Sequence, residues 1–197
     1  MQVVLASGNA GKLVEFQTLL ASTALDVVEL SAAAPNFEMP EETGATFIEN
    51  ALIKARAVAA ATGSAALADD SGLVVPALGG APGIYSARYA GKQGNDAANN
   101  QKLIEALKSI ERREAFFYCA ITLLRHDRDP TPVIATAAWH GEILNAPRGA
   151  QGFGYDPLFL VTGLDKTSAE LPRDLKNRLS HRGQATATLL QEIRAGL

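Results

Sequence analysis

Leu67-Ala68-Asp69-Asp70-Ser71-Gly72-Leu73 places two adjacent carboxylates inside an otherwise apolar run. The run from Ala65 to Val75, with glycine before it and proline after it, is typical of a buried strand. Burying neighbouring carboxylates costs free energy unless a cation or several hydrogen-bond donors meet them. Because successive side chains of a strand point to opposite faces, Asp69 and Asp70 can share one site only where the backbone bends, and Ser71-Gly72 is where we expect that bend. The alternative is an edge turn that carries two solvated acids.

The bulk composition is that of an ordinary globular protein. The chain has 197 residues, of which 47% are hydrophobic and 20% are charged, enough for one domain with a full core. These proportions argue against a disordered chain. The formal net charge of -3 does not indicate a nucleic-acid binder, so any polyanion must be met locally, by a basic cluster or by a metal ion. We expect a single domain over residues 1–197 and no nucleic-acid partner.

The cysteine content and the lengths of the apolar stretches indicate the compartment. Cys119 is the only cysteine, so the chain cannot form an internal disulfide, which suits a reducing cytoplasm. We expect its thiol to lie in the core, since the flanking run from Phe116 to Leu124 is apolar. Residues 2–6 are too short for a signal peptide, and no stretch approaches the roughly 18 apolar residues that span a bilayer. The sequence therefore predicts a cytoplasmic protein that does not contact a membrane.

A Gly-rich turn near the N-terminus has the arrangement of an anion-binding site. Val3 to Ala6 predicts a short buried strand, and apolar residues recur at helical spacing after the turn Ser7-Gly8-Asn9-Ala10-Gly11-Lys12. In such a strand, turn and helix, backbone N–H groups and the helix N-terminus can receive a phosphate. Lys12 in the first helical turn opposes the helix dipole, so a ligand explains its position better than helix stability does. The spacing is not that of a Walker A motif, and an ordinary strand-to-helix turn is the alternative.

The most clearly marked helix begins after a capping box at Thr46 and ends at Gly63. Glu42 stands just ahead of it, where an acid favours the helix dipole. Asn50 and Lys54 are one helical turn apart and could face the same site as Glu42. A solvated helix face is the alternative for these residues.

The other elements alternate strands with helices. We expect strands over residues 26–30, 115–125, 133–140 and 158–161, and helices over residues 96–107 and from Pro172 onward, the last interrupted near Ser180. The two longest strands form a hairpin that is a candidate projecting lobe or dimer surface. Strands alternating with helices, together with a long hairpin, predict an α/β protein with a mixed sheet.

Two later segments carry side chains suited to a nucleotide. In Gly152-Phe153-Gly154-Tyr155-Asp156-Pro157, glycines on both sides of Phe153 leave the ring face accessible, as a base-stacking platform requires. A core aromatic beside a turn is the alternative. Lys176, His181 and Arg182 follow in a basic region and are potential donors to a ligand. The three histidines lack metal-ligand spacing, so we do not expect a zinc site.

Carboxylates beside a phosphate repel it unless a hard cation lies between them. Mg²⁺ fits this role, since it binds through one or two carboxylates together with phosphate oxygens, and Glu42, Asp69 and Asp70 are the acids available. A second carboxylate could then deprotonate or orient the attacking water. A phosphate cradle, metal-binding acids and an aromatic platform together predict hydrolysis of a nucleotide phosphoanhydride.

These segments resemble the family of non-canonical purine nucleoside triphosphate pyrophosphatases, which act on inosine and xanthosine triphosphates. The resemblance spans nearly the whole chain, and its motifs stand in the family's order. They are Ser7-Gly8-Asn9-Ala10-Gly11-Lys12, Glu42-Thr43-Gly44-x-Thr46-Phe47-x-Glu49-Asn50-Ala51, Ala68-Asp69-Asp70-Ser71-Gly72-Leu73, Pro82-Gly83-Ile84-Tyr85-Ser86-Ala87-Arg88, Gly152-Phe153-Gly154-Tyr155-Asp156-Pro157 and Ser180-His181-Arg182-Gly183. Ser7 stands where the family often has threonine, and the hydroxyl is retained.

The resemblance implies hydrolysis of ITP, dITP and XTP between the α- and β-phosphates with Mg²⁺, giving the monophosphate and pyrophosphate and cleansing the nucleotide pool. It also implies an α/β fold with a mixed, elongated sheet flanked by helices, two lobes around a central nucleotide cleft, and a homodimer. By motif, Asp70 is the proton acceptor and a metal ligand, Glu42 is a metal ligand, and Asp69 is a catalytic residue that supports the metal and the water. The implied substrate-binding residues are Ser7, Gly8, Asn9, Ala10, Gly11, Lys12, Ser71, Phe153, Gly154, Tyr155, Asp156, Lys176, His181 and Arg182.

Base selectivity has a physical basis. Donors aimed at a 6-oxo group accept inosine or xanthosine, whereas a 6-amino group leaves donor facing donor, at a cost of roughly 1–3 kcal/mol for each unpaired buried donor. We expect His181, Arg182 and backbone N–H groups near Phe153 and Tyr155 to be these donors.

Three other functions share parts of this pattern. A pyrophosphatase for modified pyrimidines or dUTP would share the phosphate site but differ at the base pocket. A non-catalytic nucleotide sensor would keep the Lys12 turn without needing Glu42, Asp69 and Asp70 together. A metal-dependent phosphomonoesterase would release phosphate instead of pyrophosphate.

Overall fold

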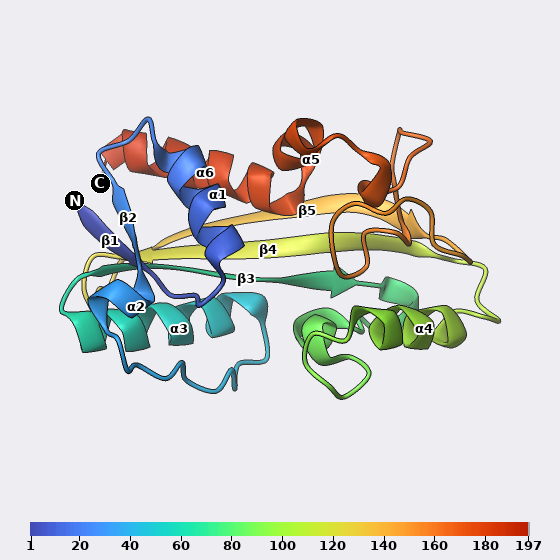
Figure 1. The fold of residues 1–197 in the computed structure, drawn as a ribbon, viewed down its shortest axis with the longest axis horizontal. Coiled ribbons are helices and arrows are strands. Elements are labelled where there is room, and N and C mark those ends of the chain that lie inside the picture. Colours follow the sequence, from blue (N-terminus) through green and yellow to red (C-terminus); the bar gives the residue numbers. More distant parts are fainter. Residues whose placement is uncertain (197) are drawn as a thin grey trace. The chain divides into compact units, whose positions relative to one another are not determined.

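The structure is a computed structural model that describes residues 1–196 and has an α/β fold (Figure 1). Along the chain its elements are β1 (Gln2–Leu5), α1 (Ala10–Leu20), β2 (Asp26–Glu29), α2 (Leu30–Ala33), α3 (Phe47–Thr62), β3 (Ala65–Val74), α4 (Asp96–Ala106), β4 (Glu114–Leu124), β5 (Val133–Ile143), β6 (Phe159–Val161), α5 (Arg173–Leu179) and α6 (His181–Gly196). Short 3-10 segments at Pro76–Leu78, Gly83–Arg88 and Ser168–Glu170 lie in the connections.

Within the described part of the chain, six strands form one sheet in the order β2-β1-β3-β4-β5-β6. β1 pairs in parallel with β2 and with β3, whereas β5 and β6 are antiparallel, so the sheet is mixed. Val3 lies opposite Val27 of β2 on one side and Ala65 of β3 on the other. The predicted fold class, a mixed sheet flanked by helices, is confirmed.

The chain divides into two compact units, each with its own apolar core. The first unit comprises Met1–Asp70, Ala120–Thr136 and the chain from Ala185 onward. The second comprises Ser71–Cys119 and Ala137–Gln184. The boundary between Asp70 and Ser71 falls inside β3, so consecutive residues of one strand belong to different units.

Helix α3 covers one face of β1 and β3 in the first unit. Val4 and Ala66 are fully buried and pack with Val58 of α3 in one apolar cluster, where small alanines on both elements let the helix lie close to the strands. Figure 1 shows α1 on the opposite side of β1 from α3, and the buried residues of α1 are Phe16 and Leu20. The two helices therefore approach the first unit's strands from opposite faces.

Both ends of α3 are defined as the sequence predicts. Thr46 Oγ1 accepts a hydrogen bond from the Glu49 N–H at 3.2 Å, and Glu49 Oε2 accepts one from the Thr46 N–H at 2.8 Å. Gly63 ends the helix in the left-handed conformation with φ of 64°. Ahead of the cap, the Gly44 N–H donates to Asn50 Oδ1 at 2.8 Å, and a Cβ at Gly44 would lie 2.7 Å from that oxygen. Glycine is needed there for close packing against α3.

Aromatic rings fill the core of the second unit. Phe117 of β4 lies 4.7 Å from Phe159 of β6, and Trp139 of β5 lies 5.3 Å from the same ring, measured between centroids. Leu103 and Leu107, at the C-terminal end of α4, are fully buried in this cluster. The apolar face of α4 thus packs against this core.

The turn between β4 and β5 is held by a buried carboxylate. Asp129, whose side chain is 1% exposed, accepts hydrogen bonds from Arg125 Nε at 2.8 Å and from the Thr131 N–H at 3.0 Å. These contacts lower the pKa of Asp129, chiefly through the Arg125 side chain. The predicted hairpin is confirmed, and its turn is closed by a charge-assisted network.

Two local predictions fail. The strand predicted to reach Leu30 ends at Glu29, because Leu30 begins α2 and turns its buried side chain into the first unit's core. The prediction of a bend at Ser71-Gly72 is wrong, since β3 runs unbroken from Ala65 to Val74.

Cys119 is fully buried, as predicted. Among the described residues, no helix combines the length and the apolar character that a membrane crossing requires.

Candidate active site

The Gly-rich turn after β1 becomes the N-terminus of α1. Asn9 caps this helix, because its Oδ1 accepts from the Gly11 N–H at 2.8 Å and from the Lys12 N–H at 3.2 Å, and its own N–H donates to Ser7 Oγ at 3.2 Å. The Asn9, Gly11 and Lys12 N–H groups are thus satisfied within the turn. All of the residues predicted for the phosphate site, Ser7 to Lys12, lie in this compact cap.

Lys12 projects from the first turn of α1 to a buried acid. Its Nζ lies 2.7 Å from Asp69 Oδ1, and the Asp69 side chain is only 1% exposed. Since a buried carboxylate needs a cation or donors, this ion pair explains how β3 tolerates Asp69.

Asp70 takes a different cation. Lys54 Nζ of α3 lies 3.3 Å from Asp70 Oδ1 and 2.7 Å from Glu42 Oε1, so one ammonium joins two carboxylates from separate elements. Asn50 Nδ2, one helical turn before Lys54, donates to Asp70 Oδ2 at 3.3 Å. The alternative of a solvated helix face is therefore wrong for Asn50 and Lys54.

The geometry also explains why β3 needs no bend. Asp69 and Asp70 point to opposite faces, as strand neighbours do, and α1 and α3 lie on those faces (Figure 1). Each helix supplies one lysine, Lys12 or Lys54. The two acids therefore do not share one site. Each forms its own ion pair, on its own face of β3.

Burial and charge move the pKa values in the Asp70 cluster. Burial raises the pKa of Asp70, and the negative charge of Glu42 raises it further, against the opposing effects of Lys54 and Asn50. Burial alone would lower the pKa of Lys54, but the charges of Asp70, Glu42 and Asp69 outweigh it and raise that pKa. A carboxylate whose pKa is raised toward neutrality is suited to accept a proton.

The donor set at this cluster fits Mg²⁺. Glu42 and Asp70 both lie within hydrogen-bond distance of the same Lys54 Nζ, so their oxygens converge on one cationic group. Mg²⁺ commonly binds through one or two carboxylates and completes its coordination with phosphate oxygens and water. Glu42 and Asp70 are the residues that would hold it.

In the second unit, Asp156 organises the aromatic loop. Asp156 Oδ2 accepts from the Phe153 N–H at 2.9 Å and from Lys176 Nζ, and Asp156 Oδ1 accepts from Ser168 Oγ at 2.7 Å. The Phe153 ring is 70% exposed and has Lys176 Nζ 5.5 Å from its centroid. The predicted exposure of Phe153 is confirmed, and the core-aromatic alternative is wrong.

Glycine is required at Gly152 for space as well as for conformation. Its φ is +83°, and a Cβ there would overlap Asp156 Oδ2 and come within 2.9 Å of Lys176 Nζ. Gly154 also has a positive φ, of +61°, but a Cβ there would meet nothing within 4 Å.

Two of the backbone N–H groups expected near the base have side-chain partners in this structure. The Phe153 N–H donates to Asp156 and the Gly154 N–H donates to Asp96 at 2.7 Å, so these two backbone groups already have acceptors. The sequence did not indicate Asp96 as a partner of the Gly154 N–H. The side chains of His181 and Arg182 are the other expected donors.

Arg182 and His181 begin α6. Arg182, 8% exposed, directs Nη2 to Ser71 Oγ at 3.4 Å, which brings two predicted substrate-binding residues together. The His181 ring stacks on Phe117 at 4.9 Å between centroids, with an interplanar angle of 11°.

Tyr155 of the aromatic loop is also buried. Burial raises the pKa of Tyr155, which stays protonated and donates its hydroxyl hydrogen to the Ser86 carbonyl at 2.8 Å.

Two residues near this loop were missed. Asp96 and Asn100 of α4 both contact Gly154, yet the sequence indicated only a helix there. Their i, i+4 spacing on one helix face was the available signal, and it is shared by many solvated helices.

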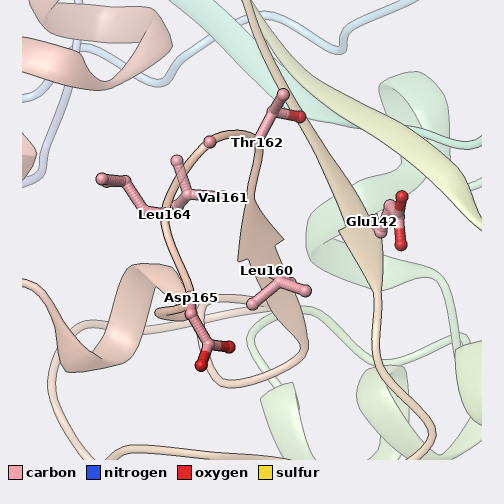
Figure 2. A pocket seen from close by; sticks show the side chains of 7 residues that line it. Glu142, Leu160, Val161, Thr162, Leu164 and Asp165 are labelled. Atoms are coloured by element: carbon pink, nitrogen blue, oxygen red, sulfur yellow. The ribbon is translucent and has the colours of Figure 1, made fainter.

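A surface hollow of about 360 Å³ lies elsewhere in the second unit, at β5 and β6 (Figure 2). Its lining residues are Glu142, Leu160, Val161, Thr162, Gly163, Leu164 and Asp165. None of the predicted site residues lines it.

Comparison with known proteins gives a consistent family. The model of the Ham1 family matches residues 3–192. A dITP/XTP pyrophosphatase from Shigella flexneri is 52% identical over 197 residues, covering 99% of each chain, and one from Xanthomonas campestris pv. campestris (strain 8004) is 55% identical over 195 residues, covering 98% of this chain and 97% of that protein. The solved structure of a HAM1 protein from Coxiella burnetii matches with a TM-score of 0.95 at 46% identity, covering 100% of both chains. On these matches, the chain belongs to the Ham1 family.

Proposed function

We propose that this protein is a Mg²⁺-dependent hydrolase that cleaves ITP, dITP and XTP to the nucleoside monophosphate and pyrophosphate, removing them from the nucleotide pool. Its full-length relatives named dITP/XTP pyrophosphatase support this activity. The observation that carries it in this chain is the Asp70 cluster, where the carboxylates of Asp70 and Glu42 meet at the same Lys54 ammonium group.

Asp70 is the proton acceptor for the attacking water and, with Glu42, a ligand of the metal. Mg²⁺, when bound, neutralises phosphate charge and lowers the pKa of bound water. Lys54 and Asn50 hold the Asp70 carboxylate in place, through contacts of 3.3 Å each. Asp69 supports the reaction by orienting Lys12 through their ion pair.

The triphosphate is bound by the Ser7–Lys12 turn. Lys12 provides the positive charge, and the N-terminus of α1 provides a favourable dipole end. Because Asn9 already caps this helix, phosphate binding competes with the Asn9 side chain for the Gly11 and Lys12 N–H groups.

The purine is held by Phe153 and the residues around it. Phe153 offers an exposed ring for stacking, with Lys176 beside it. His181 and Arg182 donate to the 6-oxo group, Ser71 contacts the nucleotide beside Arg182, and Gly154, Tyr155 and Asp156 shape the loop.

We also propose that residues 1–197 act as one catalytic domain and that the enzyme is a cytoplasmic homodimer. The domain proposal is supported by the family match over residues 3–192. The family resemblance supports the dimer, and a single buried cysteine suits the reducing cytoplasm. Light scattering after gel filtration tests the dimer, with a mass of twice 20.7 kDa expected and a monomer mass contradicting it.

A nucleotide sensor is the competing function. It would need Lys12 but would gain nothing from a carboxylate pair that raises the pKa of Asp70. The test is ITP turnover with Mg²⁺ by wild type, Asp70→Asn and the matched control Asp26→Asn, an exposed strand aspartate. We expect a loss of at least about a hundredfold in Asp70→Asn alone, as for removal of a general base. Turnover within tenfold of wild type in Asp70→Asn would exclude Asp70 as the proton acceptor.

A further inference from the structure

Both backbone polar groups of Gly154 are held by side chains of α4, the green helix labelled in Figure 1. Asp96 Oδ2 accepts from the Gly154 N–H at 2.7 Å, and Asn100 Nδ2 donates to the Gly154 carbonyl at 2.9 Å. The two side chains are one helical turn apart on α4 and more than 50 residues from Gly154 along the chain. We call Asp96 and Asn100 the Gly154 clamp.

The helix that carries the clamp is itself fixed. Asn99, 2% exposed, accepts from the Ala90 N–H at 2.7 Å and donates to the Ala87 carbonyl at 3.3 Å. Leu103, one turn further, is fully buried in the second unit's core. The clamp therefore extends from a rigid element, as precise placement of a loop requires.

The clamp acts on the residue next to the exposed ring. Phe153 is 70% exposed, so core packing does not set the direction of its side chain. Its backbone is set instead by three successive hydrogen bonds, from the Phe153 N–H to Asp156, from the Gly154 N–H to Asp96, and to the Gly154 carbonyl from Asn100. Gly154, with φ of +61°, gives the peptide a conformation that few other residues adopt.

We propose that Asp96 and Asn100 are positioning residues that orient the Phe153 ring for the purine base, an inference that rests on the proposed function. They touch neither the phosphates nor the reacting bond. The clamp contributes to base binding and base preference, and Asp70 governs the rate of hydrolysis. Removing the clamp therefore raises KM for ITP while leaving kcat nearly unchanged.

The expected rise in KM can be estimated from the two hydrogen bonds of the clamp. Each hydrogen bond contributes about 1 kcal/mol net, so losing both corresponds to roughly a tenfold to thirtyfold change in affinity. We expect Asp96→Ala combined with Asn100→Ala to raise KM for ITP about tenfold, with kcat within about twofold of wild type. Because a mobile ring no longer fixes the base against His181 and Arg182, the ratio of kcat/KM for ITP over ATP should fall as well.

The matched control is Gln101→Ala, at an exposed position of the same helix. Asp96→Asn is the rescue variant, since an amide oxygen can still accept from the Gly154 N–H and should restore most of the affinity. Asn100→Leu has a similar volume and removes the donor to the Gly154 carbonyl without adding a charge, so it replaces the double variant if that fails to fold. A merely structural clamp would lower the melting temperature and the active fraction, which reduces kcat for every substrate and leaves KM unchanged.

Amide hydrogen exchange without substrate gives an independent readout. The Gly154 N–H should exchange at least about tenfold faster in Asp96→Ala than in wild type or Gln101→Ala, because it loses its acceptor. A KM that stays within twofold of wild type, or a kcat loss without a KM change, overturns the inference while wild type remains active. An inactive wild-type enzyme overturns the proposed function instead, and unchanged Gly154 exchange refutes the clamp itself.

Discussion

At the scale of single residues, neighbouring positions in β3 have opposite environments. Asp69 is paired with Lys12 and Asp70 with Lys54, although the two acids are adjacent and chemically identical. The apolar run predicted a buried strand, in which both acids would need a cation or hydrogen-bond donors, with a solvated edge turn as the alternative. It could not say which cation each would meet, because that depends on which helix covers which face of the strand.

Arg182 gives the first prediction at this scale. Arg182→Ala removes a nearly buried donor beside Ser71, so the kcat/KM ratio for ITP over ATP should fall by about tenfold or more. Steady-state kinetics with both nucleotides measures the ratio, and Arg178→Ala, an exposed arginine of α5, is the control. An unchanged ratio would remove Arg182 from the base-recognition role.

Gly152 gives the second prediction at the residue scale. Gly152→Ala forces a Cβ into the contact between Asp156 and Lys176 at a position with φ of +83°, so we expect a loss of about 2–4 kcal/mol in the free energy of unfolding. Gly154→Ala carries the strain of a positive φ without the overlap and should lose only about 1 kcal/mol. Urea unfolding measures both, and equal losses would mean that the overlap at Gly152 is relieved without cost.

At the scale of elements, most boundaries followed from local chemistry. The capping box at Thr46, the glycine at position 63 and the two long strand-forming runs of β4 and β5 are short-range signals, and each element formed within a few residues of its predicted bounds. The failures came from long-range packing. Leu30 begins α2 instead of extending β2, and its side chain packs in the first unit's core. The contacts of α4 with Gly154 join segments that are far apart in the sequence.

The β4–β5 turn yields a pH-dependent prediction. The pKa of Asp129 is lowered in the folded protein, so its contribution to stability is present above the ordinary value of 3.8 and is lost as pH falls through the folded pKa. Asp129→Asn should therefore cost about 2 kcal/mol at pH 7, less than a fully buried network because Arg125 is 41% exposed, and the difference should shrink toward pH 3. Urea unfolding between pH 7 and pH 3 measures this.

The same turn provides its control. Asp127→Asn alters an exposed carboxylate that lies 3.9 Å from Arg128 Nε, and it should change stability by less than about 0.5 kcal/mol at any pH. If Asp129→Asn were equally mild at pH 7, the turn would not depend on its carboxylate.

At the scale of the whole molecule, sequence reasoning reached the fold class and the family because the chemistry sits in long, ordered motifs. Ser7 to Lys12, the double aspartate and the Phe153 loop each carry a local pattern, and the three patterns together in one chain indicate a nucleotide phosphate site. The supporting partners were harder to see, since Asn50, Lys54 and Asn100 resemble residues of ordinary helix surfaces until a tertiary contact singles them out. Local pattern thus indicated the motif residues, whereas the residues that hold them in place became visible only in the structure.

The most direct test of the account is product analysis of a nucleotide panel with Mg²⁺. ITP, dITP, XTP, ATP, GTP and dUTP are each incubated with the enzyme, and monophosphate, pyrophosphate and orthophosphate are quantified. The account predicts equal amounts of monophosphate and pyrophosphate from ITP, dITP and XTP, with little product from ATP and dUTP. Release of orthophosphate, a preference for dUTP or no turnover of any nucleotide would contradict it.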